Sequence, residues 1–269
     1  MAAISAPAPA AKAFRFPGQR KLEHSLFVYR RIWRGTFFGT LVSPVLFLTA
    51  MGVALGSLVA SMTTFGGVPY IVFLAPGLVA AQAMQTSVQE SAWPLFAGFK
   101  WNKTFEAMIG TPQGVRDIVL GHLYWLTVRI GMVTGIFLLV AVAFGAITSI
   151  TAILAWPAVV LTGIAFGMTM AAWTATQKTE SSFPIIFRFI VTPLFLFSGT
   201  FFPIEQLPDQ IEWVAWFTPL FHGVDLARRL AIGHDLDPVV LLIHVAVLVT
   251  MATVATLVAF RTFRNRLVV

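Results

Sequence analysis

Charged residues are scarce in this sequence of 269 residues: Asp, Glu, Lys and Arg make up 11% of it, and hydrophobic residues make up 58%. Soluble domains typically contain about 25% charged residues. Residues 35–89 and 130–177 contain no charged side chain at all. Because such segments could not cover the surface of a water-soluble domain, we exclude a soluble enzyme, a nucleic-acid-binding protein with a basic surface and a disordered chain. The sequence predicts a protein that crosses a membrane several times and contacts membrane lipid.

The residues needed for catalysis or metal binding are also missing. The absence of cysteine excludes disulfides, thiolate metal sites and cysteine nucleophiles, and the five histidines form no HxxxH or ExxH pair, so we expect no metal site. Lys103-Thr104 resembles the end of a phosphate-binding loop, but that loop requires glycines where Ala97 and Asn102 stand. We therefore expect no catalytic residue and no nucleotide site in this chain.

The apolar stretches are long enough for six transmembrane helices of about 20 residues or more. Turns rich in Gly or Ser/Thr at 61–69 and 145–151 divide the two charge-free stretches. The expected fold class is an all-α polytopic membrane protein, with a disordered tail at 1–19 and a single six-span domain at 36–269. The predicted spans are 37–60, 70–89, 118–144, 150–174, 183–202 and 238–260.

Basic residues predict the orientation of these spans. The N-terminal segment, the connections after the second and fourth spans and the C-terminal tail together hold 14 of the 18 Lys and Arg residues. With six spans, these segments all lie on one side of the membrane. Because an excess of Lys and Arg marks cytoplasmic segments, we expect both termini to be cytoplasmic.

Two cytoplasmic segments are predicted to be helical without crossing the membrane. Leu22, Leu26 and Tyr29 recur at helical spacing opposite basic residues, which predicts an amphipathic interfacial helix at 20–35; a soluble helix packed on a partner is the alternative. The loop at 91–117 is unusually apolar for a solvated connection, and Pro112 ends any helix in it. Its aromatic residues predict either a docking surface for a soluble partner or a position in the lipid headgroup region.

The segment at 201–237, on the opposite side, combines prolines with aromatic and acidic residues. Pro203, Pro208 and Pro219 exclude one continuous helix. Trp213 and Trp216 are typical of a membrane interface, whereas the nearby acidic residues require water. We therefore predict a pair of short re-entrant helices between the fifth and sixth spans.

A few polar side chains fall inside the predicted spans. Arg129, about ten residues into the third span, is costly in a membrane, and we expect it to face a cavity or a partner, or to brace two helices by pairing with Glu90. His122 and His244 are interpreted as neutral, hydrogen-bonded packing residues. The four GxxxG pairs in or beside the spans predict close helix packing, within or between protomers.

Residues 194–208, LFLFSGTFFPIEQLP, and 219–229, PLFHGVDLARR, resemble the signature of ABC-2 type exporter permeases. Thr200 is a minor departure from that signature, and the six-span order resembles the family over nearly the whole chain. The resemblance is greatest to the branch of nodulation lipo-oligosaccharide and daunorubicin-type drug exporters. The signature residues in this chain are Leu207, Pro208, Pro219, His222 and Arg228.

The resemblance implies a half-transporter in the bacterial cytoplasmic membrane. Two permease copies, expected as a homodimer although a heterodimer stays open, would pair with separate ABC ATPase subunits that bind ATP and Mg. The 91–117 loop would be the coupling segment, and the re-entrant helices would cap the pathway. Residues expected to couple to the ATPase are Phe99, Trp101, Lys103, Phe105, Glu106 and Met108. Aromatic residues that would line the pathway, or alternatively face lipid, are Phe187, Phe195, Phe197 and Phe201.

The function that the resemblance implies is ATP-driven export of a hydrophobic or amphiphilic molecule, such as a drug, a lipid or a lipo-oligosaccharide. The same architecture serves export of a lipid-linked polysaccharide. An ATP-independent channel or carrier, and a membrane scaffold without transport, remain alternatives from other functional classes.

Overall fold

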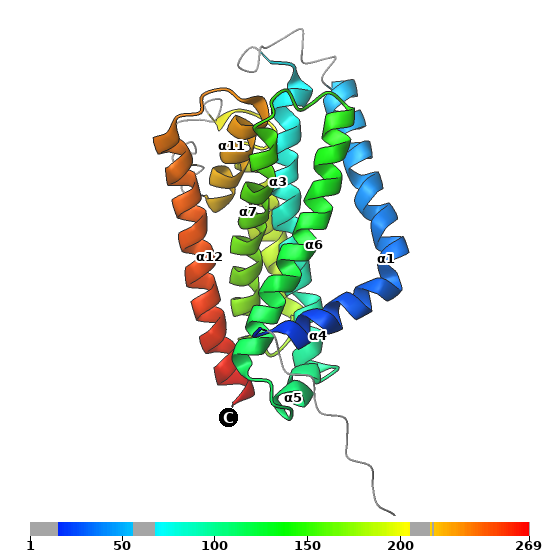
Figure 1. Ribbon diagram of the computed structural model, residues 1–269, viewed down its shortest axis with the longest axis vertical. Helices are drawn as coiled ribbons and strands as arrows, with labels where there is room; N and C mark the ends of the chain where they lie inside the picture. Colours follow the sequence, from blue (N-terminus) through cyan, green and yellow to red (C-terminus); the bar gives the residue numbers. More distant parts are fainter. Residues whose placement is uncertain (1–15, 56–67, 205–215, 217, 269) are drawn as a thin grey trace, which may run out of the picture.

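The computed structural model describes residues 16–55, 68–204, 216 and 218–268, and these residues form a bundle of long helices (Figure 1). The prediction of an all-α protein with six membrane-spanning helices is confirmed, since six of its helical segments are long and apolar enough to cross a membrane. The long helices are α1 (Gln19–Phe47), α3 (Tyr70–Ser91), α6 (Val115–Ala143), α7 (Ala152–Thr174) and α12 (Pro238–Leu267). The shorter elements are η1 (Leu48–Leu55), α4 (Trp93–Lys100), α5 (Thr104–Ile109), η2 (Glu180–Ser182), α8 (Phe183–Ile186), η3 (Phe187–Val191), α9 (Thr192–Phe197) and α11 (Pro219–Ile232).

The helix α1 contains both the predicted interfacial segment and the start of the first span. The chain stays helical from Gln19 to Phe47, and the first part of α1 runs across one end of the bundle before the helix turns to run along it (Figure 1). No proline interrupts the helix before Pro44, which is followed by the wider turns of η1. The predicted tail at 1–19 lies outside the described residues up to position 15.

The start of α1 is fixed to the start of α6. The carboxylate of Asp117 accepts hydrogen bonds from the backbone N–H of Gly114 at 2.8 Å and of Gly18 at 3.0 Å. Gly18 has φ 83° and a Cβ there would lie 2.5 Å from the backbone N of Gly121, so this contact requires glycine. One acidic side chain therefore caps α6 and holds the beginning of α1 against it.

The core of the bundle lies along α3 and α7. In α3 nearly every residue from Val72 to Ala81 is buried, and α7 packs against it. Gly163 and Gly167 of α7 permit this approach. A Cβ at position 163 would lie 2.8 Å from Ile130 of α6 and 3.2 Å from the Ala83 carbonyl oxygen of α3, and one at position 167 would lie 2.7 Å from Leu126 of α6 and 3.0 Å from Ser87 of α3. Helices α1 and α12 lie on opposite flanks of the bundle (Figure 1).

The fifth span is shorter and less regular than predicted. It comprises η2, α8, η3 and α9, and its helix ends at Phe197 instead of continuing to residue 202. The physical reason is Gly199, whose φ of 77° is incompatible with a continuing right-handed helix. Only 11% of its most apolar window is buried within the chain, the lowest value among the six spans.

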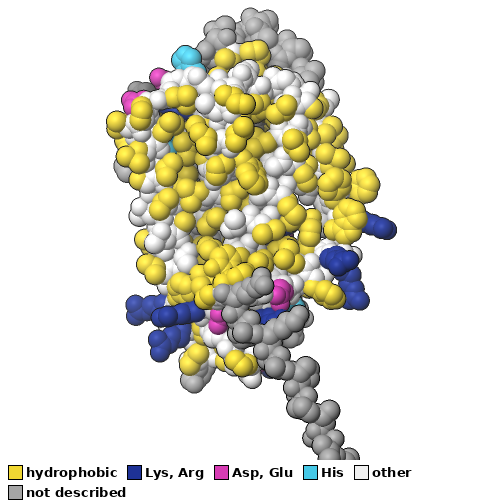
Figure 2. Space-filling view, viewed as in Figure 1, with side chains coloured by type: hydrophobic (Ala, Val, Ile, Leu, Met, Phe, Trp, Pro, Cys, Tyr) yellow, Lys and Arg dark blue, Asp and Glu magenta, His cyan; other side chains and the backbone are white. Residues whose placement is uncertain are grey.

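The two ends of the bundle differ in charge. Most of the visible Lys and Arg side chains gather at the end that carries the C-terminus, and an apolar surface separates them from the opposite end (Figure 2). We call these the C-terminal end, which includes α4 and α5, and the far end, which includes α11. The predicted pair of re-entrant helices stays a prediction, because residues 205–215 and 217 lie outside the described part of the chain.

Candidate functional site

The helices α4 and α5 form a compact hairpin at the C-terminal end of the bundle. Helix α3 ends at Ser91, and Pro94 in the first turn of α4 sets the new helix direction. Lys103 adopts a left-handed conformation with φ 50° and so separates α4 from α5. The loop at 91–117 is thus mostly helical, and it lies beside the last turns of α12.

An aromatic cluster holds this hairpin to the bundle. The ring centroids of Phe99 and Phe105 lie 4.7 Å apart, and Phe263 of α12 lies 5.0 Å from Phe99. All three side chains are at most 5% exposed. The guanidinium of Arg266 lies 4.3 Å above the Phe99 ring and donates to the Thr174 and Ala175 carbonyls at the end of α7. Phe99 and Phe105 therefore form the base of the hairpin.

Other residues expected to couple to a partner lie on the outer surface of the hairpin. Trp101 is 54% exposed, which is unusual for so large an apolar side chain. Lys103 and Glu106 are exposed and form a loose ion pair at 3.9 Å, which contributes little to stability. Met108 is half-buried. We call Trp101, Lys103 and Glu106 the hairpin surface.

At the far end, α11 carries three residues of the sequence signature. Thr218 caps the helix by accepting a hydrogen bond from the Phe221 N–H, and Pro219 occupies its first turn. Arg228 donates to the carbonyls of Phe73 at 3.2 Å and Gly199 at 2.6 Å, which joins α11 to α3 and to the end of the fifth span. The signature residues Leu207 and Pro208 lie outside the described residues.

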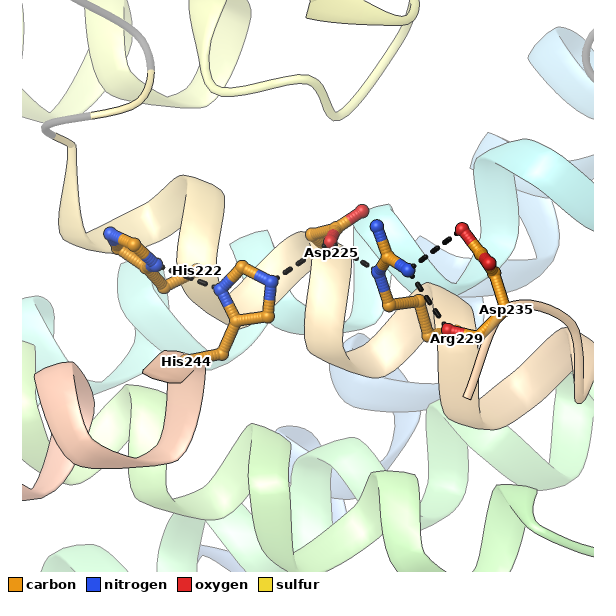
Figure 3. Close-up of polar contacts among 5 residues, drawn as sticks. All are labelled: His222, Asp225, Arg229, Asp235 and His244. Atoms are coloured by element: carbon orange, nitrogen blue, oxygen red, sulfur yellow. Dashed lines mark hydrogen bonds and ion pairs between the residues drawn. The ribbon is translucent and has the colours of Figure 1, made fainter. Parts of the chain in front are cut away.

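A chain of polar side chains connects α11 to α12 (Figure 3). His222 shares a 2.8 Å hydrogen bond with His244 through the two Nδ1 atoms, and Nε2 of His244 lies 3.0 Å from Asp225. Arg229 donates to Asp225 at 2.6 Å and to Asp235 at 3.0 Å. Because each hydrogen bond contains one proton, both histidines cannot be protonated at Nδ1 while this contact is intact.

The polar chain shifts the ionisation of its members on α11. Burial lowers the pKa of His222 below its usual value, and the neighbouring His244 lowers it further. Burial alone would raise the pKa of Asp225, but hydrogen bonds from His244 and Arg229 and the Arg229 charge lower it instead. Desolvation opposes the charge of Arg229, but the two aspartates raise its pKa overall.

Sequence reasoning missed this polar chain, although one signal for it exists. His222, Asp225 and Arg229 recur at helical spacing, so they share one face of α11. The partner His244 comes from another helix and gives no such signal. Within the described residues no cluster of histidine and acidic side chains could hold a metal ion.

The aromatic residues predicted for a pathway are spread along the fifth span. Phe187 stacks near Trp93 of α4, with ring centroids 5.0 Å apart, and Phe195 contacts Phe201 at the same distance. Phe197 is 47% exposed on the surface of the single chain. In the single chain these side chains have three different surroundings, and their role in lining a pathway between two copies stays a prediction.

Arg129 forms the ion pair that was one of the two expectations for it. Its Nε donates to Oε1 of Glu90 at 3.0 Å, and Nε1 of Trp125 donates to the other Glu90 oxygen at 3.0 Å. The guanidinium also lies 5.2 Å from the ring centroid of Tyr29 in α1. The pair thus connects α6 to α3, and α1 covers it from one side. His122, which is buried, shares a hydrogen bond with Ser91 of α3.

Six apolar helices and a helical hairpin with an exposed outer surface at the basic end define a polytopic membrane protein that fits a transport subunit. Residues 25–231, more than half of the chain, match the ABC-2 type transporter family. The chain belongs to this family, and its fold is that of the membrane-spanning permease subunit.

Named relatives cover most of this chain. It is 32% identical over 240 residues to Nodulation protein J of Rhizobium meliloti, which is 89% of each chain. It is 32% identical over 250 residues to Nodulation protein J of Rhizobium leguminosarum bv. viciae, which is 90% of this chain and 94% of that one. It is 24% identical over 226 residues to the inner membrane transport permease YadH of Escherichia coli, which is 83% of this chain and 86% of that one.

Proposed function

We propose that the chain is the permease half of an ATP-driven exporter, and that a separate ABC ATPase subunit docks on the hairpin surface. The observation that carries this proposal is that the hairpin has a buried aromatic face toward the bundle and an exposed aromatic side chain on its outer surface. Buried Phe99 and Phe105 pack against Phe263 of α12, whereas Trp101 contacts Phe96 at one edge and is 54% exposed. An exposed tryptophan on a rigid base is typical of a residue that anchors a protein interface.

The proposed cargo is a hydrophobic or amphiphilic molecule, such as a drug, a lipid or a lipo-oligosaccharide, exported from the cytoplasm or the inner leaflet. The ATPase would bind ATP and Mg and transmit its motion through the hairpin to α3 and the bundle. The basic C-terminal end would face the cytoplasm, which places both termini inside the cell. The printed name of one relative, the inner membrane transport permease YadH, supports transport, and the other two relatives are named for nodulation.

A second copy of the chain completes the proposed transporter. The fifth span exposes Phe189, Ile185 and Ile190, which are 68%, 58% and 53% accessible in the single chain. A pathway between two copies would place this face and Phe197 at the interface. The alternative of a lipid-linked polysaccharide as cargo uses the same architecture, and transport that continues without any ATPase would favour a channel or carrier.

The docking proposal is tested with the double substitution Trp101→Ala and Glu106→Ala. The variant should insert and fold normally, because both side chains are exposed, but it should no longer copurify with an ABC ATPase subunit that copurifies with the unsubstituted chain. Loss of a central interface tryptophan costs about 2 kcal/mol or more, which lowers affinity about thirtyfold.

The matched control is Trp216→Ala, which removes an exposed tryptophan, 49% accessible, close to α11 at the far end. This control should bind the ATPase as the unsubstituted chain does. If the double variant retains full ATPase binding, the assignment of the hairpin surface is wrong.

A further inference from the structure

The charged pair of Arg129 and Glu90 lies between two adjoining cavities. The first, of about 400 Å³, lies between α1 and the α4–α5 and α6 side chains and includes Lys21 near the C-terminal end. The second, of about 370 Å³, continues along α1 past Thr40 and Gln82. Both cavities are lined by Thr36, Glu90, Pro94 and Arg129. A groove with mixed polar and apolar lining therefore leads from the C-terminal end of the bundle past Arg129.

The guanidinium of Arg129 has unused hydrogen-bonding capacity. Arginine carries five N–H donors, and the Nε–H of Arg129 is the one that reaches Glu90. In the part of the chain that the structure describes, neither terminal amino group of Arg129 donates to a protein acceptor. The side chain is nevertheless only 11% exposed. A nearly buried guanidinium with free donors, facing two cavities, is arranged to receive an acceptor from outside the chain.

The charge around the groove favours an anion as that acceptor. Lys21 and Arg129 are the basic side chains that line the first cavity, and Glu90 is its acidic one. Both Glu90 oxygens are already occupied, by Arg129 at 3.0 Å and by Trp125 at 3.0 Å. The groove therefore has a surplus of positive charge and of hydrogen-bond donors.

The second cavity adds uncharged polar groups next to the positive charge of Arg129. Thr36 and Thr40 donate to backbone carbonyls one turn earlier in α1, so their oxygen lone pairs stay available to a ligand. Gln82, Gln89 and Ser43 line the same cavity. These polar groups suit the head group of an amphiphile, whose acyl chain can lie along the exposed apolar face of α1.

We propose that this groove binds the phosphate group of an amphiphile, with the fork of Arg129 as its anchor. Guanidinium forks bind phosphate in two parallel hydrogen bonds, which is the pairing that two free amino groups permit. The site is assigned to the cytoplasmic leaflet, and this placement rests on the proposed function, which orients the C-terminal end toward the cytoplasm. If the bound molecule is the exported one, the proposed cargo is an amphiphile that carries a phosphate group.

The test measures binding of dihexanoyl phosphatidate to the purified full-length chain in detergent, without any ATPase. Arg129→Gln should weaken binding about tenfold or more, because a charge-assisted pair is lost. The matched control is Arg116→Gln, which removes the same charge from an exposed position on the same helix, outside both cavities. This control should bind like the unsubstituted chain.

Two further variants keep the test decisive if Arg129→Gln fails to fold. Arg129→Lys retains the charge beside Glu90 but lacks the fork, so binding should weaken severalfold. Glu90→Gln releases the Nε–H of Arg129 and removes the competing carboxylate, so phosphatidate should bind more tightly. A gain in affinity cannot result from misfolding.

Equal phosphatidate binding by the unsubstituted chain and Arg129→Lys, or weaker binding by Glu90→Gln, would overturn the proposal. Equal binding of dihexanoylglycerol, which lacks the phosphate, would show that the groove does not recognise phosphate. Inorganic phosphate binding as tightly as phosphatidate would assign the site to a soluble anion instead of an amphiphile. Because no ATPase is present, failure here leaves the docking result for Trp101 and Glu106 unaffected, and the reverse also holds.

Discussion

Partly buried arginines in this protein connect helices that are distant in sequence. Arg228 contacts carbonyls of α3 and of the segment after α9, and Arg129 contacts Glu90 of α3. An unpaired polar group in a membrane interior costs several kcal/mol, so such contacts select one arrangement of the helices over others. Arginine suits these positions because its several N–H donors can form hydrogen bonds to two helices at once.

The polar chain of α11 and α12 predicts a dependence of stability on pH. The pKa of His222 is lower in the folded chain than the unfolded value of about 6.5. The unfolded chain therefore binds more protons in this range, so stability is full above pH 6.5 and falls as the pH is lowered through that value toward the folded pKa. We expect the thermal midpoint of the purified protein to fall between pH 7.5 and pH 5, measured by loss of monodisperse protein on size exclusion.

The variant His222→Gln should reduce this pH dependence, because glutamine does not titrate and can still hydrogen-bond to His244. The exposed His234 provides the control, since His234→Gln should leave the dependence unchanged. An equally steep pH dependence in His222→Gln would show that the titrating group is elsewhere.

At the scale of elements, the hairpin of α4 and α5 depends on one close contact. A Cβ on Gly98 would lie 2.6 Å from the Phe105 ring, and that ring is enclosed by Phe99 and Phe263. The ring cannot move without displacing the aromatic cluster. Glycine at this position therefore lets α5 lie directly against α4.

Gly98→Ala should displace α5 and weaken the attachment of the hairpin to α12. Overpacking of this kind costs about 1–3 kcal/mol. The expected result is faster limited proteolysis at the hairpin in membranes, with the six spans still inserted. Gly110→Ala, where the nearest non-neighbour atom lies 3.4 Å away, is the control and should be cleaved at the original rate. Equal cleavage rates for the two variants would contradict the packing account.

The sequence predicted the membrane spans more accurately than the way in which neighbouring helices are joined and packed. Charge-free runs of membrane length define the spans, because burial in lipid constrains composition along the whole helix. The continuity of α1 was missed, because an interfacial and a spanning segment have different compositions but no stop signal lies between them. The inward orientation of Phe99 in α4 and of Phe105 in α5 was missed because these helices, with eight and six residues, have too few turns to reveal their buried face. Their partner Phe263 is supplied by the last helix.

The whole molecule has large lipid-exposed or partner-exposed apolar faces. In the single chain, 17% of the apolar window of the first span and 11% of that of the fifth are buried, against 83% for the second. A second copy packed against the fifth span would bury its exposed face. The chain contains no cysteine, so single cysteines can report such contacts without background.

Phe189→Cys should form a disulfide-linked dimer when membranes are oxidised, because the proposed interface would place the two copies of this side chain near one another. Leu242→Cys on α12 is the control, since it is equally exposed, at 68%, but lies on another helix. Dimers should be absent for that control. Cross-linking of Leu242→Cys but not of Phe189→Cys would place the interface elsewhere.

The central claim is that an ABC ATPase docks on the hairpin surface, and site-specific photo-cross-linking tests it most directly. Trp101→p-benzoylphenylalanine, in cells that express the ABC ATPase subunit that copurifies with the chain, should yield a covalent adduct with that ATPase on irradiation. Trp216→p-benzoylphenylalanine at the far end should yield none. An adduct from position 216 and none from position 101 would contradict the account.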